Sequence, residues 1–242
     1  MKALSTAKPL RRRQLPTPKR RRTFGKRVVE AAVPPNADDR ETHERLLNAG
    51  TRLFADRGFS KVTVRDICSQ ANANVAAVNY HFGGKAGLYD AVMRSAIRIM
   101  QGTTEAARQA GENRSPEEQL EAYVVIFLQR VAAKARDSWI HQLMMHELSD
   151  PTHALDMVAE EVIQPRLDYL TSIIVRLLGS DEDDPRVARC LLSVNAQVLA
   201  LLGHPVVARL RFGTSPAPER IDELARHITC FSLAGIRAIA TT

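Results

Sequence analysis

The sequence predicts an all-α fold in which a three-helix head is followed by a larger helical domain. Apolar residues recur at three- and four-residue spacing from Asp38 onward, which is the period of one face of an α-helix. No segment alternates apolar and polar residues as a half-buried strand does, and no Asn-Gly hairpin signal occurs. Stretches rich in Pro, Gly, Ser and Asp interrupt the helical pattern, so several separate helices are expected.

The composition indicates a globular protein. The 242 residues are 45% apolar and 25% charged, and a chain of this length can bury a substantial core. No apolar run approaches the roughly 18 residues that a membrane-spanning helix needs. No apolar segment follows the basic N-terminus, which argues against a secretory signal, although an Arg-rich start also fits an organellar transit peptide. Cys68, Cys190 and Cys230 form no C-x-x-C motif, so we expect three buried thiols in a reducing, cytoplasmic setting.

The net charge of +7 is unevenly distributed. Residues 1–35 hold 11 of the 34 Lys and Arg residues and a single acid, Glu30, which leaves 23 bases and 26 acids for the rest of the chain. Because this segment has few apolar side chains to offset the entropy of ordering, residues 1–39 are predicted to form a disordered basic arm. Such an arm could bind a nucleic-acid backbone, act as a localisation signal or remain a solvated tail, and a misplaced gene start would also explain it.

The first helix of the head is predicted to run from Asp38 to Gly58, which is a typical residue just beyond a helix C-terminus. A second, short helix should follow. Thr63 can cap it, and Asp66, three residues later, completes a variant of the capping box.

Asparagine and glycine residues delimit the third helix. Asn72 lies in the preceding turn, where Asn tolerates left-handed backbone geometry. Asn74 should cap the helix, which runs to about Tyr80. The pair Gly83-Gly84 ends it, and a long fourth helix is expected from residue 85 to beyond residue 100.

The remainder of the chain is predicted to be helical, in segments at about 117–136, 138–148, 152–178, 185–202 and 217–239. Pro165 falls inside the third segment and should kink it, because proline cannot donate a backbone hydrogen bond. The last two segments are apolar on more than one side and need covering on several faces. A four-helix interface between two chains would provide this cover, and so would a central position in a monomer.

The second and third helices have the dimensions of a helix-turn-helix, from Thr63 to Phe82. Small residues would let the third helix approach both the second helix and a DNA groove, and Val75 and Val78 should anchor one edge of it. Asn can pair with adenine in bidentate fashion and Ala can contact a thymine methyl group, whereas Tyr, Thr and Lys suit phosphates. The candidate DNA contacts are Thr63, Arg65, Asn74, Ala77, Asn79, Tyr80, His81 and Lys85.

Two considerations weigh against this interpretation. Residues 38–90 contain seven bases and seven acids, so no strong basic patch marks the site. Tyr80 and His81 could also serve only as local caps and hydrogen-bond partners. Neutrality of the head makes the basic arm, or the paired heads of a dimer, more useful for affinity.

Residues 40–100 resemble the N-terminal DNA-binding domain of TetR-family transcriptional regulators. The matching features are the helix end LFADRGF, the segment TVRDI, the capped third helix, YHF, and GKAGLY at the start of the fourth helix. The sequence departs from the common pattern at Asn72, Gly84 and Ala86, where Gly, a Ser cap and an acid are usual. The C-terminal part is similar to one subgroup of the family, through EEVIQPRL at 160–167 and GHPVVARL at 203–210.

The resemblance implies a homodimeric regulator, with a palindromic DNA operator and a small-molecule effector as partners, and with residues 101–242 forming the effector-binding and dimerisation domain. Repression relieved by the effector is the expected mode. Apolar walls with a few polar groups suit a small-molecule site, although such side chains are also ordinary core. The candidate effector residues are Tyr123, Phe127, Trp139, His141, Met144, Met145 and Tyr169.

No sequence motif calls for an enzyme, a cofactor or a metal. The chain has no nucleophile elbow, phosphate-binding glycine loop or dinucleotide fingerprint. His141 and His146 are five residues apart, which is not the spacing of H-E-x-x-H. Two alternatives stay open: a helical small-molecule carrier or enzyme with an incidental helix-turn-helix, and a sequence-tolerant architectural DNA-binding protein that acts through its basic arm.

Overall fold

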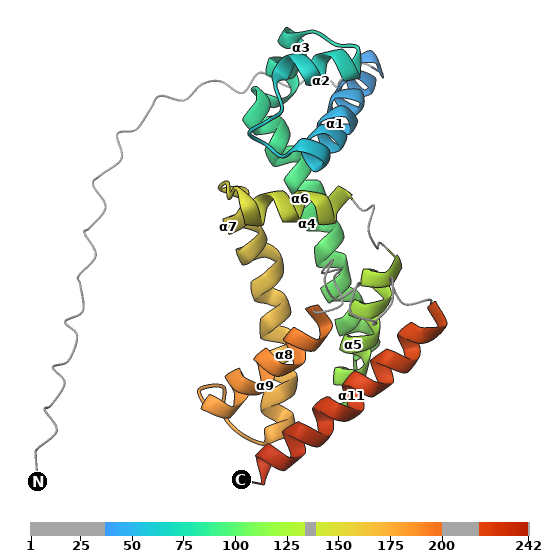
Figure 1. Ribbon diagram of the computed structural model, residues 1–242, viewed down its shortest axis with the longest axis vertical. Coiled ribbons are helices and arrows are strands. Elements are labelled where there is room, and N and C mark those ends of the chain that lie inside the picture. The colour runs from blue at the N-terminus through green and yellow to red at the C-terminus, as the bar shows by residue number, and fades with distance from the viewer. Residues whose placement is uncertain (1–36, 134–138, 200–217, 242) are drawn as a thin grey trace, which may run out of the picture. The chain divides into compact units, whose positions relative to one another are not determined.

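The computed structural model describes residues 37–133, 139–199 and 218–241, and every regular element in these ranges is a helix (Figure 1). The prediction of an all-α fold is therefore confirmed. The basic arm before residue 37 and the motif at 203–210 lie outside the described residues. None of the described helices is long and apolar enough to cross a membrane.

The head contains α1 (Ala37–Arg57), α2 (Val64–Ala71) and α3 (Val75–Phe82). The capping box of α2 forms as predicted, because Thr63 Oγ1 accepts from the Asp66 N–H at 3.2 Å while Asp66 Oδ2 accepts from the Thr63 N–H at 2.9 Å. Asn72 adopts the left-handed conformation, with φ of 50°, and its N–H donates to the carbonyl of Cys68. An Asn therefore performs here what Gly performs in the common pattern.

The end of α3 and the start of α4 (Lys85–Ala110) depend on glycine. Gly83 has φ of 73° and donates its N–H to the carbonyl of Asn79, which closes the last turn of α3. A Cβ at Gly87 would lie 1.8 Å from the carbonyl oxygen of Phe82. Only glycine allows this approach, so the GKAGLY segment fixes how α4 leaves the end of α3.

Two apolar cores lie along α4. The head core is the cluster of buried apolar residues drawn from Leu46–Ile97 and Ile140–Val162. It therefore includes side chains of α6 (Trp139–Ser149), α7 (Ala154–Val158) and the turn η1 (Ala159–Ile163), and α6 packs against α1. The helices of the head are not sufficient to close their own core.

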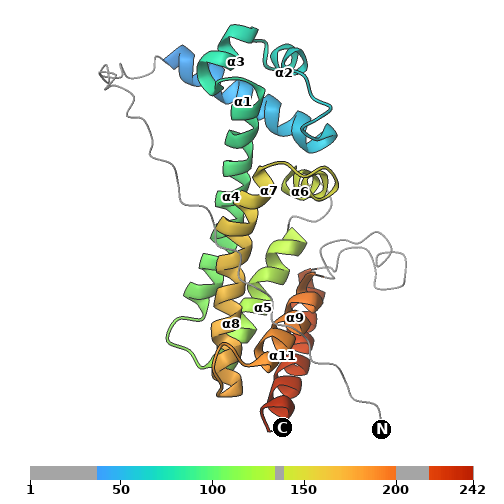
Figure 2. The ribbon, with the colours of Figure 1, turned by 90° about the vertical axis from the view of Figure 1, so that its left-hand side faces the viewer.

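The C-terminal core is the cluster of buried apolar residues drawn from Ala107–Leu128 and Tyr169–Ile236. It joins the end of α4 to α5 (Pro116–Ala133), α8 (Gln164–Leu178), α9 (Pro185–Leu199) and α11 (Pro218–Ala240). Figure 2 shows α4 and α8 running alongside each other, with α5, α9 and α11 next to them. One helix, α4, thus contributes to both cores.

Pro165 changes the helix in a way that differs from the predicted kink. The sequence predicts a kink at this proline, and the structure places one π-helical turn, η1, directly before α8. Gln164 donates its N–H to the carbonyl of Ala159, five residues back, and Pro165 has no N–H for the carbonyl of Glu161. Gln101 Nε2, on α4, donates to that carbonyl at 3.2 Å.

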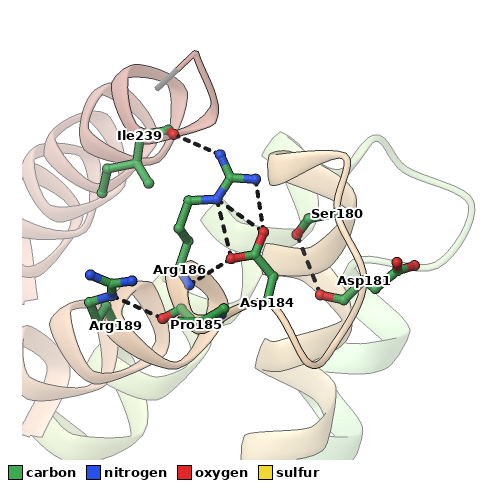
Figure 3. A network of polar contacts seen from close by, with 7 residues as sticks. All are labelled: Ser180, Asp181, Asp184, Pro185, Arg186, Arg189 and Ile239. Atoms are coloured by element: carbon green, nitrogen blue, oxygen red, sulfur yellow. Dashed lines mark hydrogen bonds and ion pairs between the residues drawn. The ribbon is translucent and has the colours of Figure 1, made fainter.

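A polar network holds the beginning of α9 against the end of α11 (Figure 3). Asp184 Oδ1 accepts from the N–H of Arg186 at 2.8 Å and so caps α9, while the guanidinium of Arg186 pairs with the same carboxylate at 2.8 Å. Arg186 also donates to the carbonyl of Ile239 at 3.2 Å. Hydrogen bonding by Arg186 keeps the pKa of Asp184 below its usual range.

The cysteines are only partly as predicted. Cys68 and Cys190 are buried, and burial raises the pKa of both thiols. Cys230 is exposed, so the prediction of a third buried thiol is wrong. It lies on the outward side of α11, which is also apolar and which the sequence pattern does not distinguish from the inward side.

Candidate nucleic-acid interface

The residues that α3 exposes differ in part from the predicted ones, as if the helix were slightly rotated about its axis. Val78 is fully buried and anchors the helix, but Val75 is 48% exposed, so the prediction that both valines anchor one edge is wrong. Val75 is the first residue of the helix, and helical side chains point toward the N-terminus, which directs it beyond the edge of the head core. Ala77 is half-buried against that core, whereas Ala76 is exposed.

The two asparagines of α3 are not equivalent. Asn74 Oδ1 accepts from the N–H of Ala77 at 2.8 Å, so its oxygen is committed to capping the helix. Asn79 is exposed on the last full turn, and its side chain makes no hydrogen bond to the described residues. Bidentate pairing with adenine uses both the oxygen and the amide of the side chain. Only Asn79 can offer both without uncapping α3.

Tyr80 and His81 occupy different environments. Tyr80 is 76% exposed, and neither residue has a side-chain hydrogen bond within the described ranges. The ring of His81 is half-buried, 5.0 Å from the ring of Tyr80 and 5.8 Å from that of His43 on α1. Gly83, rather than either side chain, terminates the helix. Tyr80 therefore projects outward while His81 is held against α1.

The predicted DNA contacts outside α3 lie at the starts of α2 and α4. Arg65 is exposed in the first turn of α2. The hydroxyl of Thr63 already donates to Asp66 Oδ2 at 2.6 Å, so a phosphate would have to compete with this carboxylate. Lys85 is half-buried with its ammonium 4.2 Å from the centre of the Phe59 ring, and desolvation lowers its pKa.

The predicted effector residues lie in two separate places. Tyr123, Phe127 and Tyr169 belong to the C-terminal core, where the ring of Tyr123 lies 4.6 Å from that of Phe127 and 6.4 Å from that of Tyr169. The predicted residues of α6 lie elsewhere, since Trp139 and Met144 pack against the head core, His141 is half-buried and Met145 is exposed. The two groups do not form one cluster.

Two charged residues that the sequence reasoning did not select lie near these groups. The guanidinium of Arg166 lies 5.5 Å from the centre of the Phe127 ring. Glu147 is 1% exposed and accepts a hydrogen bond from the hydroxyl of Tyr89 on α4. Arg166 is part of the EEVIQPRL segment, but its place beside Phe127 depends on the packing of α8 against α5 and could not be seen in the sequence.

The fold and the site together define a class of protein. The capped helix α3 presents outward from a helical head an Asn side chain that has no hydrogen bond within the described residues, and one long helix joins that head to a second helical core. This is the architecture of a helix-turn-helix DNA-binding protein with a helical second domain.

Comparison with protein families makes the assignment specific. The model for bacterial regulatory proteins of the tetR family matches residues 46–92. The model for the C-terminal domain of the HTH-type transcriptional dual regulator CecR matches residues 116–236, half of the chain. The chain belongs to the TetR family of transcriptional regulators, as the resemblance of residues 40–100 predicts.

Individual relatives agree with this assignment. The dual regulator CecR of Shigella flexneri is 26% identical over 200 residues, which cover 78% of this chain and 89% of the relative. A protein of Escherichia coli K12 named a probable acrEF/envCD operon repressor is 26% identical over 157 residues, which cover 64% of this chain and 69% of the relative. A TetR-family regulator from Streptomyces coelicolor shares the fold, with a TM-score of 0.56, 21% identity and coverage of 81% and 90%.

The family consists of transcriptional regulators and not of enzymes. The chain is therefore a DNA-binding transcriptional regulator.

Proposed function

We propose that the protein represses transcription as a homodimer, in which two α3 helices read the halves of a palindromic operator and a small molecule in the C-terminal domain releases them. The observation that carries the DNA-reading part is the exposed Asn79, which has no side-chain partner within the described residues. The relative in Escherichia coli is itself named an operon repressor, which supports repression as the direction of control.

In the proposed complex, Asn79 pairs with an adenine in the major groove. Ala76 and Val75 are exposed beside it and can contact thymine methyl groups, a role that the sequence assigns to Ala77. The residues expected to position the head on phosphates are Thr63, Tyr80 and Lys85, and Arg65, Asn74 and His81 are the other candidate DNA contacts. The head is balanced in charge, so sequence-independent affinity would come largely from the basic arm and from pairing two heads.

Exposed apolar stripes on α9 and α11 support the dimer. On α9 the stripe consists of Ala188, Leu192, Ala196 and Leu199, with Leu192 69% exposed. On α11 it consists of Phe231, Ala234 and Ala238, with Phe231 64% exposed. Apolar patches of this kind mark protein interfaces, and two antiparallel copies of each helix would make a four-helix interface.

The Arg186 network in Figure 3 ties the start of α9 to the end of α11, and in the proposed dimer both stripes would belong to one surface. A dimer built there would hold two heads for successive major grooves, about 34–36 Å apart.

The route from effector to DNA would run through α4 and α6. Both contribute to the head core, and α4 continues into the C-terminal core. A ligand that binds one arrangement of these helices more tightly than another would change the spacing of the heads. The coupling this requires is about 1–3 kcal/mol.

The test is binding of the full-length protein to a labelled fragment from upstream of its own gene, followed by fluorescence anisotropy at several salt concentrations. We expect a palindromic sequence there to be bound. Lys85→Ala should weaken every sequence alike and lower the salt slope by about one phosphate contact. Gln142→Ala, a change at an exposed residue of α6, is the matched control and should bind as the wild type does. Absence of binding to any palindrome at low salt would contradict the proposal.

A further inference from the structure

Most of the buried side-chain polar atoms that lack a hydrogen bond in the described residues belong to the C-terminal domain. Within the described ranges, five side-chain nitrogen or oxygen atoms are buried and have no hydrogen bond. One belongs to the head, at Arg45, and the others are Tyr123 Oη, Arg166 Nε, Asn195 Oδ1 and Thr229 Oγ1. Native proteins pair nearly all such groups, so unpaired ones that lie close together are candidates for contact with a polar group of a ligand.

Tyr123 and Arg166 face the same small region. Tyr123 is fully buried on α5, and its ring lies 4.6 Å from that of Phe127. The guanidinium of Arg166, on α8, lies over the Phe127 ring at 5.5 Å. Burial raises the pKa of Tyr123 to about 12, against the opposing effect of the Arg166 charge, so the tyrosine keeps its proton at neutral pH. Both groups are therefore hydrogen-bond donors that have no acceptor in the described part of the chain.

Two further arginines lie beside Tyr169, whose ring is next to that of Tyr123. Arg108, on α4, lies 4.7 Å from the centre of the Tyr169 ring, and Arg176, on α8, donates to the side-chain oxygen of Gln119. None of the ion pairs formed among the described residues involves Arg108, Arg166 or Arg176. The nearest acid along α8, Asp168, accepts from Gln164 at 2.7 Å.

We propose that Tyr123 and Arg166 bind the acidic group of the effector, which is an organic acid with a carboxylate on an apolar body. A carboxylate is an acceptor on both oxygens, so it can receive the hydroxyl of Tyr123 and pair with the guanidinium of Arg166. The apolar body would pack on Phe127 and its neighbours in the C-terminal core. This inference deepens the proposed effector-released repressor and rests on it for its regulatory meaning.

The chemistry discriminates against other ligand classes. A cation would be repelled by the charge of Arg166, and a neutral amide would leave the guanidinium charge without a counter-ion. Because Arg166 is only half-buried while Tyr123 is fully buried, the carboxylate would enter from the Arg166 side. The predicted effector residues of α6 would then lie outside the acid-binding region.

The experiment compares acids with their own amides. The probe pairs are octanoate with octanamide and 4-phenylbutyrate with 4-phenylbutanamide, added to the full-length protein and followed by thermal shift and calorimetry. We expect at least one acid to raise the Tm, with at least tenfold tighter binding than its amide. Arg166→Met should abolish this preference, Tyr123→Phe should weaken acid binding several-fold, and Arg130→Met, a change at an exposed arginine of α5, should behave as the wild type.

Tyr123→Phe separates a ligand-binding role from a structural one. Because the Tyr123 hydroxyl has no partner among the residues that the structure describes, its removal should leave the Tm of the ligand-free protein unchanged or higher. A lowered Tm without ligand, equal binding of acids and amides, no binding of either acid, or an acid preference that survives Arg166→Met would each overturn the inference.

Operator binding in the same samples separates this inference from the proposed function. Release of operator by a neutral compound, equally in wild type and Arg166→Met, would uphold the repressor and overturn the acid site. Acid binding that depends on Arg166, in a protein that binds no operator, would uphold the site and contradict the repressor.

Discussion

Glu147 should be one of the residues on which stability depends most, because it is a buried acid that links three helices. Its carboxylate, on α6, is 1% exposed. It accepts from the hydroxyl of Tyr89 on α4, and from the N–H and hydroxyl of Thr152, just before α7, at 3.1 and 3.0 Å. Replacing it tests whether the head core is held to α6 by this network.

The expected loss of stability follows from the hydrogen-bond donors that would lose their acceptor. Glu147→Ala would orphan the Tyr89 hydroxyl and the Thr152 N–H, at about 1–3 kcal/mol each. Thr152 is half-buried and water can reach it in part, and removing a buried charge recovers some desolvation energy. We therefore expect a net loss of about 2–4 kcal/mol, from a total stability that is typically about 5–15 kcal/mol. For a chain of this size this corresponds to a Tm lower by roughly 4–16 °C.

The assay is urea unfolding followed by far-UV circular dichroism. Glu147→Gln keeps one acceptor oxygen and should lose less than Glu147→Ala. The double mutant of Glu147→Ala and Tyr89→Phe should show a coupling energy between the two sites of about 0.5–3 kcal/mol. The control Glu121→Ala, at an exposed residue of α5, should stay within about 0.5 kcal/mol of wild type. A similarly small loss for Glu147→Ala, or strict additivity with Tyr89→Phe, would refute the reasoning.

Three further predictions concern the head and the proposed dimer. Gly87→Ala would place a Cβ 1.8 Å from the Phe82 carbonyl and should cost about 3 kcal/mol or more in chemical denaturation. Gly102→Ala, in the same helix with open space around it, should instead stabilise by about 0.5–1 kcal/mol, so equal effects would contradict the close approach. Hydrogen bonds from Thr63 lower the pKa of Asp66 below its ordinary 3.8, so its stabilisation is complete above that pH and is lost as the pH falls through the lowered pKa. The free energy of unfolding should therefore fall less steeply with decreasing pH in Asp66→Ala than in wild type. Identical curves would contradict a stabilising role of the capping box. Phe231→Glu should give monomers in sedimentation velocity, whereas Leu148→Glu, at a residue that is also exposed but lies on α6, should not, and persistence of the dimer in Phe231→Glu would contradict an α9–α11 interface.

Local interactions explain why the helix ends of the head could be predicted from the sequence. Thr63 pairs with Asp66, and Asn74 with Ala77, across three residues, so each cap is contained in a short stretch of letters. Asn72 takes the left-handed turn for the same local reason. The sequence therefore predicts the helix ends correctly wherever such a local cap is present.

The rotation of α3 and the sides of α11 could not be predicted in this way. Only Val78 of α3 is buried, and one buried residue does not fix which face of an eight-residue helix points inward. On α11 both sides are apolar, so Cys230 and Phe231 look like core in the sequence although they are exposed.

Contacts between distant residues account for the rest of what the sequence did not show. Tyr89 and Glu147 are 58 residues apart, and Arg166 meets Phe127 only because α8 packs against α5. Neither contact can be predicted from the local sequence pattern.

The most direct measurement of the central claim is the affinity of Asn79→Ala for a set of operators that differ by single base pairs. The wild type should lose about 1–3 kcal/mol for each adenine replaced, at one particular position and at its symmetry mate. Asn79→Ala should bind the original and the replaced operators equally while keeping its preferences at the other positions. Unchanged discrimination at every position in Asn79→Ala would contradict the reading of DNA by this face of α3.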